Sequence, residues 1–172
     1  MTKDTTRRKL KYEAILEEFM ALREWADDLQ VDEDDMSVTL NTAVSFESQS
    51  GRLIVEASDK ADIVKVYFYY AVACKESKFN EMSLLFDELH RRIFFGRFVR
   101  VGEGRVRWEH FIDFEGSGPT GQSVERMVDS GWRIVAEYAP VISAVALTKQ
   151  DAAEALAEFD AETRPLDKGD SD

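Results

Sequence analysis

The sequence predicts an α+β domain in which helices flank one antiparallel sheet of about five strands. Two observations support this class. Segments rich in β-branched and aromatic residues occur in groups joined by short turns, without the regular strand and helix alternation of a parallel sheet. Each helical segment has a single apolar stripe, so each helix is expected to cover a core on one side. The predicted order is helix, three strands, helix, two strands, helix and a short C-terminal helix.

The length and charge of the chain limit its possible functions. A chain of 172 residues with 44% hydrophobic content fits one core. We expect a single domain at 1–147, a C-terminal helix at 148–160 and an acidic, disordered tail at 161–172. The net charge of -12 disfavours nucleic acid and anionic membranes as partners. The polar N-terminal segment and the lack of a long apolar run predict a cytoplasmic protein.

The first helix is predicted from about Thr5 to Leu29. Its apolar residues recur at steps of three and four, which is the spacing of one helical face. These residues are Tyr12, Ile15, Phe19, Leu22, Ala26 and Leu29. An acidic loop from Asp27 to Asp35 is expected to end the helix.

Three strands are predicted next. The segments 37–47 and 52–57 are rich in β-branched residues and flank a turn at 49–51, which indicates a hairpin. The segment 63–74 is predicted to be a central strand. Its alternate residues Val64, Val66, Phe68, Tyr70 and Val72 face one way, and Lys65, Tyr67 and Tyr69 face the other. Cys74, the only cysteine, is expected to be a buried thiol, and an intramolecular disulfide is excluded.

A second helix and a second hairpin follow. Asn80 is the predicted N-cap of this helix, and Gly96 is its predicted end. The strands 97–101 and 105–115 are joined by a turn at 102–104. The second strand places Val106, Trp108, His110, Ile112 and Phe114 on one face and Arg107, Glu109, Phe111, Asp113 and Glu115 on the other. This alternation indicates that one face of the sheet meets solvent.

A long third helix is predicted to begin at the N-cap Thr120 and to continue to about Val145. Pro140 lies inside its pattern and is expected to kink or divide it, because proline removes a helical donor. Thr148 and Asp151 have the spacing of a capping box for the C-terminal helix, whose apolar stripe is Ala152, Leu156 and Phe159.

Arginines crowd one stretch of the chain, from Arg91 to Arg107. We select Arg97, Arg100, Arg105 and Arg107 as a candidate basic patch for an acidic partner or a phosphate. The alternative is that these arginines pair with acidic regions of the same chain.

Three stretches of the chain, at 89–98, 106–116 and 138–145, carry a family resemblance. Together they resemble the YbjN-type bacterial sensory transduction regulators, with a match from about Leu84 to Leu147. The resemblance implies a fold similar to type III secretion chaperones, a homodimer and no assigned enzymatic activity. His90 departs from the family, which tends to have Asn there, so a hydrogen bond at this helix end is in question.

A glycine-rich loop at Gly116–Ser123 differs by one residue from the phosphate-binding pattern GxxxxGK[ST]. Gln122 replaces the lysine and cannot supply the positive charge that reaches the phosphates. The strand before the loop is acidic and alternating, whereas a phosphate-binding loop normally follows a buried parallel strand. We predict a simple turn leading into the third helix, with nucleotide binding or hydrolysis at this loop as the alternative function.

No other group of residues predicts catalysis. His90 and His110 are the only histidines, Cys74 lacks an activating neighbour, and the carboxylates around Glu109 share what is expected to be a solvated strand face. We therefore expect no catalytic residues, no metal and no cofactor.

Binding to another protein is the function that the sequence favours. Tyr67, Tyr69 and Phe111 lie on the more polar side of their strands and form a candidate interaction patch. The alternative is that the first or the C-terminal helix covers these rings. We predict a non-enzymatic binding module, chaperone-like or regulatory, with a protein partner.

Overall fold

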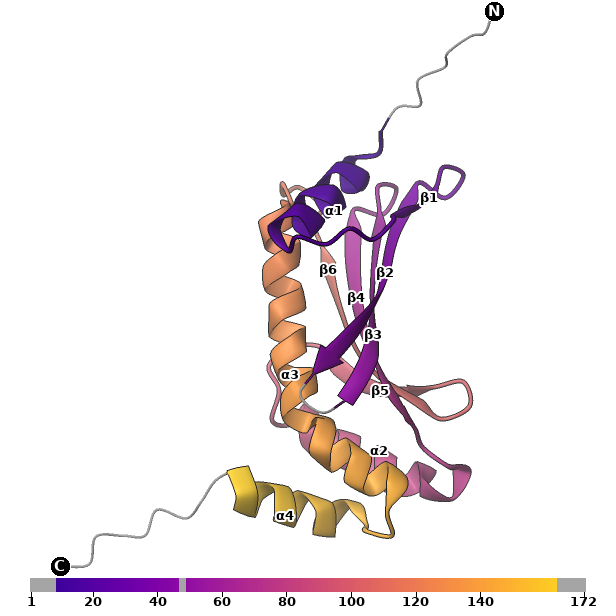
Figure 1. The fold of residues 1–172 in the computed structure, drawn as a ribbon, viewed down its shortest axis with the longest axis vertical. Helices are drawn as coiled ribbons and strands as arrows, with labels where there is room; N and C mark the ends of the chain where they lie inside the picture. Colours follow the sequence, from indigo (N-terminus) through magenta and orange to yellow (C-terminus); the bar gives the residue numbers. More distant parts are fainter. Residues whose placement is uncertain (1–8, 47–48, 164–172) are drawn as a thin grey trace, which may run out of the picture.

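The computed structural model describes residues 9–46 and 49–163 of the chain. These residues form a six-stranded antiparallel sheet and four α-helices, which confirms the α+β class and adds one strand to the predicted five. The sheet forms one side of the molecule, and the helices cover its other side and one end (Figure 1).

The sheet has the strand order β1-β2-β3-β4-β6-β5, and every neighbouring pair is antiparallel. The strands are β1 (Gln30–Asp32), β2 (Ser37–Phe46), β3 (Gln49–Ser58), β4 (Ile63–Ala73), β5 (Arg97–Val101) and β6 (Arg105–Asp113). Strand β4 lies between β3 and β6, as expected for the central strand. The pairing of β4 with β6 shifts in register between Tyr69 and Ala73.

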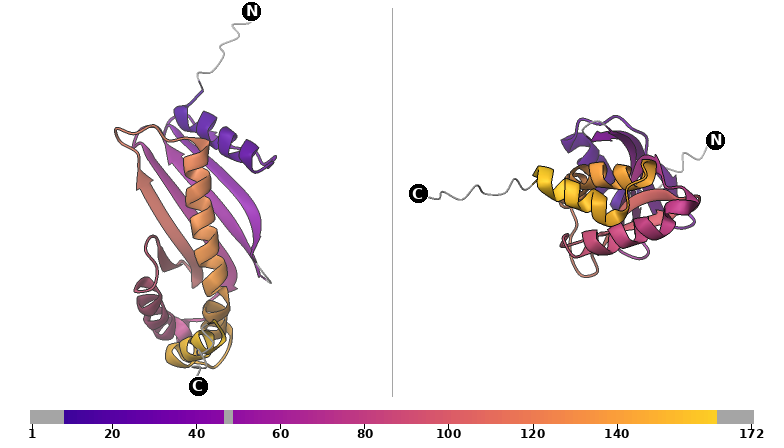
Figure 2. Two further views of the ribbon diagram at one scale, coloured as in Figure 1. Left: turned by 90° about the vertical axis from the view of Figure 1, so that its left-hand side faces the viewer. Right: turned by 90° about the horizontal axis from the view of Figure 1, so that it is seen from below.

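Four helices complete the fold: α1 (Lys11–Leu22), α2 (Phe79–His90), α3 (Gly121–Leu147) and α4 (Ala152–Thr163). A short 3-10 turn, η1 (Glu76–Lys78), precedes α2. Helices α1 and α3 lie across one face of the sheet, and α2 and α4 pack together at one end (Figure 2). The core therefore lies between this face and the four apolar stripes.

The first helix is shorter than predicted, and the prediction that it reaches Leu29 is wrong. It ends at Leu22, and Glu24 adopts a left-handed backbone conformation with φ 54°, which turns the chain away from the helical path. Trp25 and Leu29 lie beyond the helix but pack against the core, which explains why apolar residues continue past the end of the helix in the sequence. The following residues form β1, a strand within the predicted acidic loop. The predicted start at Thr5 lies outside the described residues.

Three other predicted boundaries are wrong. Residues 49–51 belong to β3 and pair with β2, so they are not the hairpin turn. Helix α2 begins at Phe79 after Lys78, which makes no side-chain cap, so Asn80 is not the N-cap. The helix ends at His90, well before Gly96. Gly96 has φ +71° and lies so close to Trp108 that a Cβ atom there would meet the indole ring at 2.3 Å.

The third helix follows its prediction closely. Thr120 is the N-cap, and its hydroxyl accepts a hydrogen bond from the Ser123 backbone N–H at 3.2 Å. Pro140 does not divide α3, but the helix changes direction along its length (Figure 1). At the C-terminal helix, Asp151 is the capping residue instead of Thr148, because its carboxylate accepts the Glu154 N–H at 2.8 Å.

The buried residues Ala152, Leu156 and Phe159 form the predicted stripe of α4. This helix extends to Thr163, past the predicted end at 160. The rest of the predicted acidic tail, residues 164–172, lies outside the described part of the chain.

Candidate functional site

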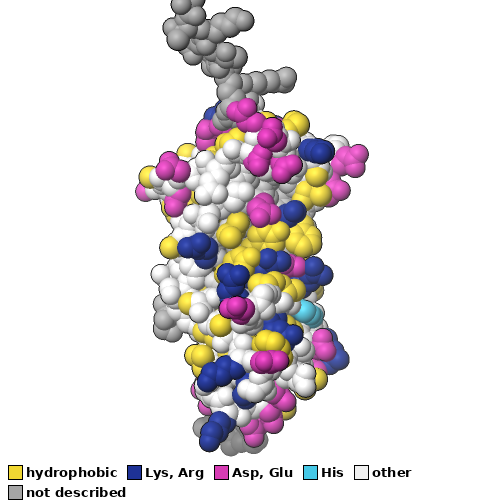
Figure 3. Space-filling view, turned by 90° about the vertical axis from the view of Figure 1, so that its right-hand side faces the viewer, with side chains coloured by type: hydrophobic (Ala, Val, Ile, Leu, Met, Phe, Trp, Pro, Cys, Tyr) yellow, Lys and Arg dark blue, Asp and Glu magenta, His cyan; other side chains and the backbone are white. Residues whose placement is uncertain are grey.

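One face of the sheet has no helix over it in the described part of the chain, and we call this surface the open face. Figure 3 views it directly. Hydrophobic and basic side chains gather over its middle, and acidic side chains concentrate toward the N-terminal end (Figure 3). The alternative that α1 or α4 covers Tyr67, Tyr69 and Phe111 is wrong, because α1 lies on the other face and α4 at the end of the molecule (Figures 1 and 2).

Side chains of the open face form rows across the strands, since directly paired residues point the same way. One row runs through Ile54, Tyr67, Glu109 and Arg97. The next row runs through Arg52, Tyr69, Arg107 and Val99. The structure therefore brings the predicted aromatic patch and three of the four predicted arginines onto one surface. We call it the arginine–aromatic face, and it consists of Tyr67, Tyr69, Phe111, Arg97, Arg105 and Arg107.

The carboxylate of Glu109 lies beneath this surface. Only 3% of the residue is exposed, although its strand position faces outward. Arg97 contacts one carboxylate oxygen through Nε at 2.7 Å and Nη2 at 2.6 Å. Arg107 contacts the other oxygen through Nε at 2.8 Å and Nη2 at 2.5 Å. Two guanidinium groups thus share one negative charge, which leaves the cluster with a net positive charge.

Aromatic rings hold the arginines in place. The Arg107 guanidinium lies 4.6 Å from the centre of the Tyr67 ring and 5.6 Å from that of Tyr69. Arg105 lies 6.0 Å from the Tyr69 ring, and Arg97 lies 5.7 Å from the Phe111 ring. These are cation–π distances, which restrict the rotamers of long side chains that are otherwise mobile.

The pKa values of this face favour fixed protonation states. Burial lowers the pKa of Arg107, but hydrogen bonds to Tyr69 and Glu109 raise it by more, so the net shift is upward. Burial, followed by the nearby negative charge of Glu56, raises the pKa of Tyr67 to about 12. The arginine therefore stays charged and the tyrosine stays neutral across the physiological range.

Arg100 does not join the arginine–aromatic face. It pairs with Val106, whose side chain points into the core, so Arg100 projects to the opposite side of the sheet. There its guanidinium lies 3.6 Å from the centre of the Phe79 ring and donates to the Phe79 carbonyl at 3.1 Å. The predicted basic patch is therefore wrong at this one residue.

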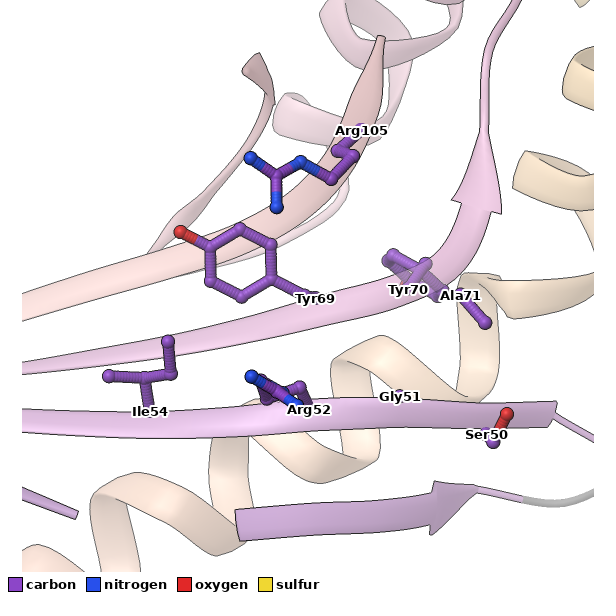
Figure 4. A pocket seen from close by; sticks show the side chains of 8 residues that line it. All are labelled: Ser50, Gly51, Arg52, Ile54, Tyr69, Tyr70, Ala71 and Arg105. Carbon is purple, nitrogen blue, oxygen red and sulfur yellow. The ribbon is translucent and has the colours of Figure 1, made fainter. Parts of the chain in front are cut away.

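A shallow hollow of about 440 Å³ lies at one end of the open face. Figure 4 shows Tyr69 between the side chains of Arg52 and Arg105, with Ile54 and Ala71 beside them. Arg52 was not identified from the sequence, because it lies far from the arginine-rich stretch and only strand pairing brings it beside Tyr69.

The glycine-rich loop offers no place for a phosphate as the chain is folded. The first backbone N–H of α3, from Gly121, donates to the Glu18 carboxylate of α1 at 2.9 Å. This carboxylate occupies the position at the helix N-terminus where a phosphate would bind. The strand before the loop, β6, is antiparallel to both of its neighbours. These contacts argue against the nucleotide alternative.

The other predicted catalytic candidates are kept apart or engaged elsewhere. Cys74 follows the end of β4, whereas His110 pairs with Val66, eight residues earlier on that strand, or about 26 Å at the rise of a β-strand. Burial raises the pKa of Cys74 and lowers that of His110, so each group favours its neutral form. Among the described residues, no group of three or more His, Cys, Asp and Glu is placed to hold a metal ion.

His90 stands where the resembled family tends to have Asn, and it does make a hydrogen bond at this helix end. Its Nε2 atom accepts a hydrogen bond from the Phe98 backbone N–H at 2.9 Å. The imidazole also stacks on the Phe98 ring, with 6.4 Å between ring centres. His90 therefore ties the end of α2 to β5.

Comparisons with known proteins add little to this description. No family model and no curated protein matches the sequence. A chain of the solved structure described as "Structure of the HopA1-SchA Chaperone-Effector Complex" is similar, with 11% identity and a TM-score of 0.44. The match covers 72% of this chain and 88% of that chain. The YbjN-type family remains a prediction.

In the part of the chain that the structure describes, none of the helices is long and apolar enough to cross a membrane.

Proposed function

We propose that this protein is a non-enzymatic binding module, chaperone-like or regulatory, that receives a protein partner on its open face. One observation carries the proposal: aromatic rings and arginines gather on a sheet face that no described helix covers. Tyrosine and arginine are the residue types that most often dominate the binding energy of protein interfaces. Phe111 adds an apolar ring that is 46% exposed.

The order of this surface also favours binding. Arg97 and Arg107 are already held by Glu109 and by stacked rings, so less side-chain entropy is lost when a partner docks. An open sheet face of this kind suits an extended segment or a protein surface better than a small molecule, which needs an enclosed pocket.

The test is site-specific photo-crosslinking in the cells that make the protein. A benzophenone amino acid replaces Phe111 on the open face, and the same group replaces Leu147 as a control. Leu147 is 67% exposed and lies at the end of α3, so both groups are accessible to solvent. We expect one discrete protein adduct from position 111 and none from position 147. No adduct at 111, or the same adducts at both positions, would contradict the proposal.

The homodimer that the family resemblance implies is part of the proposal. Static light scattering of the purified chain checks it against the mass of 19.6 kDa for one chain. A mass twice this value supports a dimer, and the mass of one chain contradicts it.

A further inference from the structure

The hollow beside Tyr69 differs from the rest of the open face in its charge. Arg97 and Arg107 share the carboxylate of Glu109. Arg52 and Arg105, which line the hollow, form no ion pair with any residue that the structure describes. Among the described residues, the positive charge of the open face is therefore least compensated at this hollow.

The hydrogen-bonding groups of the hollow suit an anion. Each guanidinium presents a fork of N–H donors that matches the two oxygens of a carboxylate. The Tyr69 hydroxyl oxygen accepts a hydrogen bond from Arg107 Nη1 at 2.8 Å, and its own O–H proton can therefore point to an added acceptor. Figure 4 shows the Arg105 side chain extending over the Tyr69 ring and Arg52 on the other side of that ring.

Apart from Ser50, the rest of the lining is mainly apolar, and the hollow is open. Ile54, Ala71 and the ring of Tyr69 line it between the two arginines. Because the hollow is open and lies on the uncovered face of the sheet, it can receive side chains of an extended chain without enclosing a whole ligand. Its charge and its lining together fit an acidic side chain next to an apolar one.

We propose that Arg52 and Arg105 bind a carboxylate side chain of an extended acidic segment in the partner protein. A neighbouring apolar side chain of that segment packs on Ile54 and the Tyr69 ring. This inference rests on the proposed function and adds to it the chemistry of the partner and the place where the partner's charge is bound.

A peptide of alternating Glu and Val, labelled with fluorescein, tests the inference by fluorescence anisotropy at low ionic strength. A matched peptide carries Gln in place of every Glu. The intact protein is expected to bind the Glu peptide and to bind the Gln peptide at least about tenfold more weakly. Replacing the exposed Arg126 of α3 by Gln is the matched control, and it should leave binding unchanged.

The variants Arg52→Gln and Arg105→Gln are each expected to weaken binding about tenfold, and more when combined. Both positions lie on the surface, so the melting temperature is expected to change by no more than about 2 °C. Arg52→Lys and Arg105→Lys keep the charge but lose the donor fork, and they should weaken binding less than Gln does.

Several results would overturn the inference. The inference is wrong if the intact protein binds the Glu and Gln peptides equally well. It is also wrong if the Glu peptide binds the double Gln variant as well as it binds the intact protein. Inorganic phosphate that binds at the hollow while the Glu peptide does not would assign the site to a different anion. A cross-link from position 111 that survives in the double Gln variant, together with unaltered peptide binding, would leave the proposed function intact and reject only this site. If the protein with Arg52 and Arg105 intact forms no adduct from position 111, the proposed function itself is rejected.

Discussion

Replacing Glu109 by Gln tests whether the buried carboxylate stabilises the open face. Glutamine keeps the volume and one acceptor oxygen, and it replaces the charge and the other acceptor oxygen by an NH2 group that cannot accept from an arginine. Breaking a fully buried ion pair costs about 3–5 kcal/mol. Here the cost is smaller, because the side chain of Arg97 is 59% exposed and that of Arg107 is 23% exposed. Surface pairs contribute up to about 1 kcal/mol, and charged hydrogen bonds about 1.5–3 kcal/mol. We expect the free energy of unfolding to fall by about 2–3 kcal/mol.

Urea denaturation followed by circular dichroism measures this loss, and the melting temperature should fall by roughly 5–10 °C. Glu88→Gln is the matched control, because Glu88 pairs with Arg91 at the end of α2, where the two side chains are 44% and 72% exposed. It should cost less than about 0.5 kcal/mol, and high salt should remove even this difference. The loss at Glu109 should persist in high salt. Equal and salt-sensitive losses in the two variants would refute the stabilising role of the buried carboxylate.

Three further predictions concern a buried glycine, a surface histidine and a tyrosine of the open face. Gly131→Ala should destabilise the protein by about 1–2 kcal/mol, because the new Cβ would lie 2.5 Å from the Trp108 ring. This loss should exceed the gain from the better helix propensity of alanine, so a rise in melting temperature would contradict the prediction. His90→Ala should cost about 1–3 kcal/mol by leaving the Phe98 N–H without its acceptor, and an unchanged urea midpoint would argue against that role. The pKa of Tyr67 is raised to about 12, so this side chain should stay protonated at pH 10–11 in the folded protein. The raised pKa contributes to the free energy of unfolding below pH 10, and this contribution is lost as the pH rises through 12. Absorbance at 295 nm should therefore increase when the protein is denatured at pH 10.5, and Tyr67→Phe should reduce this increase; a titration with every tyrosine ionising near pH 10 before unfolding would contradict it.

Elements with a strong period were predictable, and elements set by single backbone angles were not. The alternation of β6 and the N-cap Thr120 are visible in the sequence because each depends on local spacing. The end of α1 depends on the left-handed conformation of Glu24, which is unfavourable for a residue other than glycine. No pattern in the neighbouring sequence predicts it. Strand β1 has only three residues, among acidic neighbours, and it forms by pairing with β2, so it is too short to show a period of its own.

The outward position of Tyr67, Tyr69 and Phe111 was predictable from strand parity, but the positions of the four arginines were not all predicted correctly. Tyr67, Tyr69 and Phe111 stand at alternate positions, which placed them on the outward side of their strands. The same rule separates Arg97 from Arg100, since residues three apart in a strand face opposite ways. Clustering in the sequence obscured this difference.

Glu109 shows why an outward-facing position does not make a side chain exposed. Its strand alternates as a half-solvated strand should, and nothing local marks this carboxylate for burial. It is buried because Arg97 of the neighbouring strand and Arg107 of its own strand fold over it, and the Tyr67 ring stacks against Arg107. Burial of this kind arises from pairs that the strand register creates. It could be predicted only once the order β4-β6-β5 is known.

The overall charge of the protein and the local charge of the open face have opposite signs, and on the proposed function this difference makes the open face selective for an acidic partner. A net charge of -12 repels an acidic partner from most directions. On the open face, Arg52 and Arg105 form no ion pair with any of the residues 9–46 and 49–163, and aromatic rings offer contact area. The repulsion elsewhere lowers the number of unproductive encounters, and the local attraction sets the orientation of a productive one. On the proposed function, charge selects and orients the partner, and the arginines and the aromatic rings both contribute to the strength of binding.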